Sequence, residues 1–299
     1  MAGAERYSIY PGIINNGGLT LRQIGGVDLS PNTQKADIVL GGAVDRVSVP
    51  TVSADPTASI STDDLYNVLG GVSLTTGLAI SSVSTFQYQQ REDTGVFAAG
   101  STHDIVTVQK GFLTVSSITS SQDDEEGAQC QLALAALYNG SVEPLVHATT
   151  QALTSTPSFT ARYFHGPVYH NSSQVDGIIS TTVNPGLAFA AKRADGSVFP
   201  TVGSIVARLP TITFTTLKIN AAGVANMFHG ALAGTLACYY PLGVTSGTRS
   251  ASSDNIKISA ATGDWAKDGI SVSANDDGTA SVTVRPTTTL AVSTASSIP

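Results

Sequence analysis

Residues 270–285 read Ile-Ser-Val-Ser-Ala-Asn-Asp-Asp-Gly-Thr-Ala-Ser-Val-Thr-Val-Arg, two alternating runs on either side of an Asp-Asp-Gly turn. In Ile270–Ala274, and again in Ala280–Arg285, every second residue is apolar and the residues between them are polar. A period of two is typical of strands that bury one face, and the Asp-Gly pair favours a tight turn. The stretch therefore predicts a β-hairpin.

The same alternation predicts strands elsewhere. Ser84–Gln90 and Asn255–Ala260 place apolar residues at every second position. Asp195-Gly196 stands between Leu187–Ala191 and Ser197–Arg208, which predicts another hairpin.

One segment fits two kinds of structure. Ala128–Tyr138 is compatible with a helix or with a strand that ends at Asn139-Gly140. We favour a strand, because Thr279–Arg285, at the matching place later in the chain, alternates clearly.

Two short helices are predicted. Thr62 is expected to cap a helix over Asp63–Leu69, whose first turn is acidic and which Gly70-Gly71 would end. Asn220 is expected to cap a second helix that ends at Gly230 and includes Ala221–Phe228.

Short phrases of the first half recur in the second half in the same order, with slowly drifting spacing. The pairs are Arg6-Tyr7 with Arg162-Tyr163, Ser30-Pro31-Asn32 with Asn184-Pro185-Gly186, Val49-Pro50-Thr51-Val52 with Leu209-Pro210-Thr211-Ile212, Leu65–Gly71 with Val224–Gly230, and Gln122-Asp123-Asp124 with Asn275-Asp276-Asp277. Loop insertions and deletions between duplicated units produce such drift. We therefore predict an internal duplication: two tandem, mainly β domains of the sandwich or barrel type, at 1–155 and 156–299, each with one short helix.

Composition points toward a surface that meets other subunits. Charged residues make up 12% of the chain, about half of the roughly 25% usual for soluble proteins. A free monomer normally keeps itself soluble with a mixed charged surface, so a surface this poor in charge favours assembly. A β-rich secreted protein with a Ser/Thr surface is the alternative. The net charge of −7 and the scattered basic residues argue against a nucleic-acid-binding surface.

Cysteine usage and hydropathy bear on the compartment. Cys130 and Cys238 form neither a disulfide framework nor a metal-type spacing, which favours synthesis in the cytoplasm. The N-terminus has no apolar core of a signal peptide. Ala221–Val244 is the least polar stretch, but its Asn226, His229 and Pro241 lead us to expect no membrane span and no membrane partner.

No catalytic chemistry is expected. The five histidines, His103, His147, His165, His170 and His229, are scattered, and a spacing of five places His165 and His170 on opposite faces of a strand. The sequence contains no phosphate-binding loop, nucleophile elbow or zinc signature. We therefore predict no enzyme, with no catalytic, cofactor-binding or metal-binding residues and no cofactor.

One acidic run is the candidate functional segment. Asp123, Asp124, Glu125 and Glu126 are expected at a hairpin tip between strands at Gly111–Ser120 and Ala128–Tyr138. The run lacks the glycine and spacing of a known calcium loop, so a solvated, self-repelling tip is the simplest reading. A third reading is electrostatic, because a ring of such tips would repel a polyanion.

The chain resembles structural proteins of tailed bacteriophages, most of all tail tube proteins. The resemblance rests on Ser/Thr/Ala-rich strands, low charge, and the phrases Arg162-Tyr163-Phe164-His165-Gly166-Pro167-Val168-Tyr169 and Ala194-Asp195-Gly196-Ser197-Val198-Phe199-Pro200. It implies rings that stack into a tube through which DNA passes without specific binding. It also implies three chains per ring when the tube domain is duplicated, contacts with other tail proteins, and a location in the virion after synthesis in the host cytoplasm. In such a tube the acidic run is expected to face the lumen or an adjacent ring.

Three other functions stay open at this point. A capsid decoration or baseplate protein would have the same composition. A carbohydrate-binding or adhesin module would present exposed aromatic residues, against which stand the single Trp265 and an aromatic content of 6%. A hydrolase with an unrecognised site would gather carboxylates in one cleft.

Overall fold

The computed structural model describes residues 7–9, 19, 21, 25–38, 46, 48–81, 84–90, 102–125, 127–152, 161–218, 229–232, 234–243, 253–271 and 278–299. Most of these residues form antiparallel strands, and they contain one short helix. The prediction of a mainly β protein is confirmed. Below, the first half denotes described residues up to 152, and the second half those from 161.

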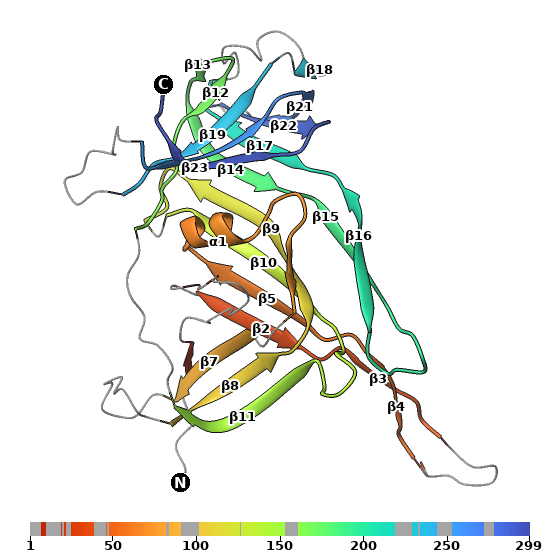
Figure 1. Cartoon of the computed structure of the whole chain (residues 1–299). Coiled ribbons are helices and arrows are strands. Elements are labelled where there is room, and N and C mark those ends of the chain that lie inside the picture. The colour runs from red at the N-terminus through yellow and green to blue at the C-terminus, as the bar shows by residue number, and fades with distance from the viewer. Residues whose placement is uncertain are drawn as a thin grey trace.

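A long sheet runs through both halves of the chain (Figure 1). Its order is β18 (His229–Leu232), β21 (Gly263–Ser271), β22 (Thr279–Pro286), β17 (Thr211–Thr216), β14 (Ile178–Asn184), β9 (Gly111–Ser121), β10 (Gln129–Ala136), β5 (Thr57–Thr62) and β2 (Gly26–Ser30), with β6 (Leu78–Ile80) paired to β9. The strands predicted at Ala128–Tyr138 and Ala280–Arg285 are confirmed as β10 and β22.

Each half adds a smaller sheet and a hairpin. The first half has β1 (Tyr7–Ile9), β7 (Ser84–Gln90), β8 (Thr102–Val108) and β11 (Leu145–Ala152), and the hairpin of β3 (Thr33–Lys35) and β4 (Thr51–Ala54). The second half has β13 (Ser173–Val175), β12 (Val168–His170), β19 (Leu236–Tyr240), β20 (Asn255–Ala260) and β23 (Ala291–Ser296), and the hairpin of β15 (Leu187–Lys192) and β16 (Val202–Arg208). None of the sheets among the described residues closes into a barrel.

The hairpin predicted at Asp195-Gly196 is confirmed, but its second strand begins at Val202 and not at Ser197. Asp195 and Gly196 both have positive φ, 55° and 72°, and Ser197 N donates to Ala194 O at 3.0 Å. Two positive φ angles are what a type I′ turn requires, and this turn matches the twist of its strands.

The helix α1 spans Leu65–Gly71, two residues later than predicted. Thr62 is still the last residue of β5, so Asp64 rather than Thr62 is the N-cap, and Asp64 N donates to Thr62 Oγ1 at 3.1 Å. Leu65, Val68 and Leu69 turn their side chains into the core. The second predicted helix, at Ala221–Phe228, lies outside the described residues.

One hydrophobic core includes residues of both halves. Ile60 and Leu113 contribute from the first half, and Phe214 and Ile258 from the second; each is at most 1% exposed. Burying a side chain of this size contributes about 1.5–3 kcal/mol.

Strand pairing follows the same plan in the two halves. The corresponding antiparallel pairs are β1–β7 and β12–β19, β2–β5 and β14–β17, β3–β4 and β15–β16, β5–β10 and β17–β22, β6–β9 and β18–β21, β7–β8 and β19–β20, β8–β11 and β20–β23, and β9–β10 and β21–β22. Connections join these strands in the same chain order.

The registers also agree, including the irregularities. In β9–β10 the register shifts between the pairs Leu132–Val115 and Gln131–Ser117, and in β21–β22 it shifts between Val282–Lys267 and Ser281–Gly269. In the hairpins, Lys35 pairs with Thr51 after a shift, and Phe189 pairs with Ile205 after the corresponding shift. These registers give residue-by-residue correspondences, such as Lys35 with Phe189 and Thr57 with Thr211.

The turn at Ser30-Pro31-Asn32 lies where its sequence echo predicts. Asn32 and Gly186 have φ of 43° and 62°, and each carbonyl accepts a backbone hydrogen bond, from Asp55 N at 3.4 Å and from Leu209 N at 3.0 Å.

Another echo falls at a different place. Leu209-Pro210-Thr211 shares its register with Asp55-Pro56-Thr57, and not with Val49-Pro50-Thr51. The dipeptide Pro-Thr occurs twice in the first half, and only the hairpin register selects between the two copies. The proposed boundary near residue 155 lies outside the described residues, so the division into domains stays a prediction.

Candidate functional site

The junction between the halves is formed by one strand from each. β9 pairs with β14 over Ile118–Val183, Thr119–Thr182, Ser120–Thr181 and Ser121–Ser180. Ile118 and Val183 are both 0% exposed. β14 is the outer strand of the second-half part of the sheet, and it pairs with β9 beyond the residues Gly111–Leu113 that β6 covers on that edge, so this single pairing makes the sheet continuous.

Buried hydrogen bonds reinforce this pairing. Ser120 Oγ lies 2.8 Å from Thr181 Oγ1 and 2.9 Å from His165 Nδ1. A serine hydroxyl within hydrogen-bond distance of an imidazole is an arrangement that some enzymes use to activate a nucleophile. Here, however, the three residues are 3–4% exposed, which leaves the Ser120 hydroxyl without access to a substrate. The cluster holds the two strands together.

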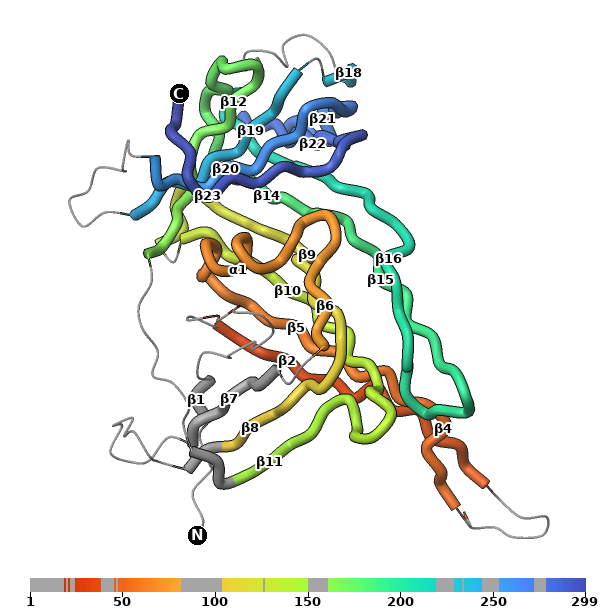
Figure 2. The backbone as a smooth tube through the Cα atoms, viewed as in Figure 1, coloured from red at the N-terminus to blue at the C-terminus, as the bar shows by residue number. Residues whose placement is uncertain are grey.

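The hairpin β15–β16 extends the junction across the first half. Figure 2 shows it running from the second-half strands to the base of β3 and β4. The rings of Phe189 and Phe112 stack with centroids 4.7 Å apart and planes at 6°. Three hydrogen bonds fix the far end: Lys110 Nζ to Thr201 O at 2.9 Å, Tyr138 N to Pro200 O at 2.7 Å, and Ala54 N to Val198 O at 3.0 Å.

Ion pairs add to the same contact. Arg193 on the hairpin side pairs with Asp55 of the first half, and Arg162 Nε lies 3.2 Å from Asp63 Oδ2 beside α1. Next to Arg162, the ring of Tyr163 stacks on the ring of Tyr66 with centroids 6.5 Å apart. Burial, followed by the nearby Tyr66, Asp254 and Asp64, raises the pKa of Tyr163 to about 12. The junction is therefore held by strand pairing, aromatic packing and charge together.

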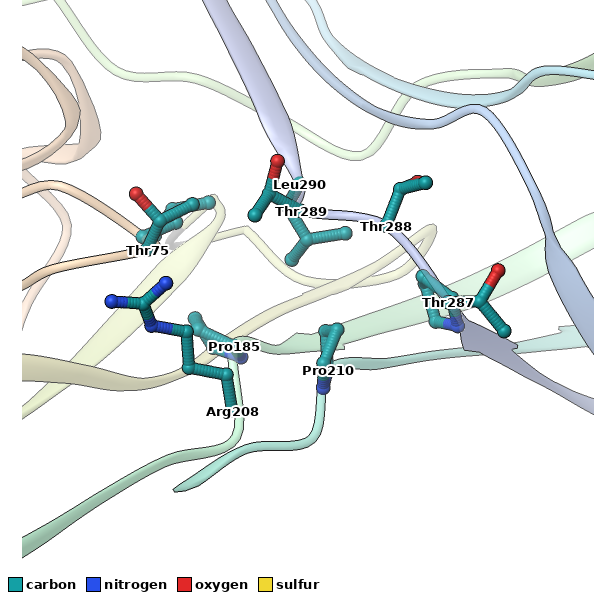
Figure 3. Close-up of a pocket in the computed structure, with 10 residues that line it drawn as sticks. Thr75, Pro185, Arg208, Pro210, Thr287, Thr288, Thr289 and Leu290 are labelled. Carbon is teal, nitrogen blue, oxygen red and sulfur yellow. The ribbon is translucent and has the colours of Figure 1, made fainter. Parts of the chain in front are cut away.

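A small cavity lies beside the junction. It has a volume of about 140 Å³, and Figure 3 shows its lining. The lining residues are Leu74, Thr75, Pro185, Arg208, Pro210, Pro286, Thr287, Thr288, Thr289 and Leu290. Arg208 is the charged residue of this set and is exposed. The lining contains no His, Cys, Asp or Glu, so it offers neither a general base nor a set of metal ligands.

The acidic run lies at the end of the junction strands. It follows β9, and Gln122 N donates to Ile179 O at 2.8 Å, just before the paired part of β14. Asp123 and Glu125 are exposed and Asp124 is half-buried, while Glu126 lies outside the described residues. The hairpin tip is confirmed for Asp123–Glu125, which lie between β9 and β10, and its orientation in an assembly stays a prediction.

The other suspected residues are dispersed. His147 Nε2 contacts Asp104 Oδ2 at 3.2 Å on β11 and β8, and His165 is buried in the junction. Cys130 and Cys238 are free and buried. In the part of the chain that the structure describes, no group of three or more His, Cys, Asp or Glu side chains is arranged to hold a metal ion. The described part also contains no helix long and apolar enough to cross a membrane.

No protein-family model matches the chain, and no curated protein matches it.

The residues that join the two halves could not be predicted from the sequence. Ser120 and Thr181 belong to unremarkable Ser/Thr-rich strands, and Phe189 to an ordinary alternating run. Their roles depend on a pairing between strands about 60 residues apart, as in the Ser120–Thr181 pair, which periodicity does not reveal.

Proposed function

We propose that this protein is a structural subunit of a tailed bacteriophage, built from two copies of one β-domain, and that its rings stack into the tail tube. Each ring contains three chains and therefore six like domains. DNA passes through the lumen, and the partners are further copies of the chain and other tail proteins.

The observation that carries the proposal is the junction itself. Two halves with the same order of strand pairs are joined edge to edge by β9 and β14. An interface between two unlike edges of similar units is heterologous, and repeating it generates a ring when the rotation closes. A chain that already contains one such contact is suited to repeat it between chains.

Charge supports the tube rather than a DNA-binding role. The net charge is −7, and the exposed Asp123 and Glu125 stand at the end of the junction strands. Like charge keeps a polyanion from adhering to a channel wall, whereas clustered Lys and Arg would bind it. The low content of charged residues, 12%, suits a chain whose faces are covered by neighbours.

Electron microscopy of the purified full chain in negative stain tests this function. We expect rings with six lobes, and tubes of stacked rings at high protein concentration. Isolated monomeric particles at every concentration would contradict the proposal. Compact trimers that never stack would favour a capsid decoration or baseplate protein instead.

A further inference from the structure

We propose that neighbouring chains join by the same contact that joins the two halves of one chain. This inference rests on the proposed ring assembly. In the contact, β2 of a second copy pairs with β21, and the β3–β4 hairpin of that copy lies across the second half. The occupant of the open β21 edge is thus a second copy of this chain, in a register that the internal junction specifies.

The register follows from the corresponding strand pairs. β2 corresponds to β14, because Leu29 pairs with Ala58 as Val183 pairs with Ile212. β21 corresponds to β9, because Ile270 lies opposite Ala280 as Ile118 lies opposite Cys130. Within the chain, Val183 pairs with Ile118 and Thr182 with Thr119. Between chains, Leu29 therefore pairs with Ile270, and Asp28 with Ser271.

Among the residues that the structure describes, both of these edges lack a strand partner over most of their length. Among the described strands, β2 pairs with β5 alone, and β18 covers β21 only over Gly263–Ala266. Ile270 is 42% exposed, whereas its counterpart Ile118, covered by β14, is 0% exposed. Leu29 is half-buried, whereas its counterpart Val183 is 0% exposed. Unpaired edges of this kind invite pairing with another chain, and apolar side chains on them increase the gain.

The hairpins supply a second, chemically independent match. Phe189 of β15 stacks on Phe112 of β9 within the chain. By register, Phe189 corresponds to Lys35 of β3, and Phe112 corresponds to Asp264 of β21. The aromatic pair of the internal junction thus becomes a pair of opposite charges between chains. Both residues are exposed, and neither takes part in an ion pair within the described part of the chain.

Further along the same hairpin, a charged pair of the internal junction corresponds to an apolar pair between chains. Arg193 pairs with Asp55 within the chain. Asp55 corresponds to Leu209, which is 73% exposed, and Arg193 corresponds to Val39, a residue outside the described part. The described member of this pair, Leu209, is apolar where Asp55 is charged, and the sequence has the apolar Val39 where Arg193 is charged. Complementary chemistry is kept at both positions although the residue types change, which is what an interface requires.

The cavity of Figure 3 lies where the neighbour's hairpin would end. Tyr138 N donates to Pro200 O at the internal junction. Tyr138 corresponds to Thr288, because Leu137 N binds Lys110 O as Thr287 N binds Thr262 O. Thr288 and Arg208 line the cavity (Figure 3), so the second copy covers its rim.

Cysteine cross-linking tests the strand register. Asp28→Cys and Ser271→Cys replace two exposed residues in separate full-length chains, and the native Cys130 and Cys238 are buried and do not interfere. After mild oxidation of the mixed chains, we expect a disulfide-linked dimer, and none from either variant alone. Gly269→Cys is the register control and Leu217→Cys, at a position 43% exposed, the proximity control; both should cross-link to Asp28→Cys far less.

A charge exchange tests the hairpin contact. Lys35→Asp and Asp264→Lys each place like charges together, so each should weaken assembly about tenfold or more at low salt. The double variant restores the opposite-charge pair and should assemble as the wild type does. The fraction of assembled protein is measured by sedimentation.

The outcomes separate the two proposals. Cross-linking at Ser271→Cys together with rescue in the double variant supports the inference. Wild-type rings that form without this cross-link, and single reversals without effect, overturn the inference but leave the proposed function standing. A wild-type chain that stays monomeric overturns both.

Discussion

Ser120 joins the two halves through a single hydroxyl, because it contacts both His165 and Thr181 at hydrogen-bond distance in a buried place. Buried polar groups stabilise a fold when they are paired and cost free energy when a partner is removed. A substitution of Ser120 should therefore change the stability of the junction.

Ser120→Ala removes the hydroxyl that both neighbours contact. We expect the free energy of unfolding to fall by about 1–3 kcal/mol. Ser116→Ala, at an exposed position of the same strand, is the control and should change it by less than about 0.5 kcal/mol. Urea denaturation measures both, and equal effects would contradict the role of the cluster.

The two buried cysteine thiols lead us to expect that the folded protein loses stability in alkali. Burial raises the pKa of Cys238 from 9.0 to about 12, and also raises that of Cys130. In the unfolded chain these groups ionise at lower pH than in the folded chain. Their contribution is therefore complete below pH 9 and is lost as the pH rises toward 12, by up to about 1.4 kcal/mol per pH unit for each group. Unfolding measured from pH 8 to 11 should show this decline, with a smaller slope for Cys238→Ala; identical slopes would refute it.

Turns set the geometry of the elements that meet at the junction. Gly186 joins β14 to the hairpin with φ of 62°, and a Cβ atom there would collide with the carbonyl oxygen of Leu209. Gly196 at the hairpin tip also has positive φ, 72°, but a Cβ atom there would meet nothing within 4 Å.

Alanine substitutions distinguish the two causes of strain. Gly196→Ala has only the cost of its backbone conformation and should destabilise by about 1 kcal/mol. Gly186→Ala adds the collision and should cost about 3 kcal/mol or more. Chemical denaturation gives both values, and a Gly186→Ala cost no larger than that of Gly196→Ala would show that the turn relaxes freely.

In the proposed tube, we expect the acidic turn between β9 and β10 to be shielded from bulky reagents. Asp123→Cys introduces the reactive thiol, because Cys130 and Cys238 are buried. In free chains, a small maleimide and one carrying a bulky polymer should both react with it. In tubes, the bulky reagent should react much more slowly, since a lumen or a ring contact excludes it. Equal reaction of the bulky reagent with tubes and with free chains would place the turn on the outer surface.

Local elements could be read from the sequence, and their long-range partners could not. Period-two alternation gave the bounds of β7 and β20 as the structure has them. It could not show that β9 pairs with β14, because the Ser/Thr residues of both strands are polar on one face and fit many partners. The helix start was misplaced by two residues because Thr62, a good N-cap residue, is held in β5.

For the whole molecule, the ordered echoes pointed to a repeated plan, and the matched strand pairs and register shifts supply the detail. The sequence could not reveal that the two halves share one sheet and one hydrophobic core. Edge strands carry no special residue pattern, and what covers them depends on the neighbour. That the two halves superpose as one repeated domain stays a prediction of the duplication.

The mass of the purified protein in solution tests the central claim, that like halves joined edge to edge assemble further by the same contact. Three chains of 30.6 kDa give a closed ring of about 92 kDa. Light scattering coupled to size-exclusion chromatography should find this mass, or tubes that are larger multiples of it. A monodisperse species of 30.6 kDa that persists at high concentration would contradict the account.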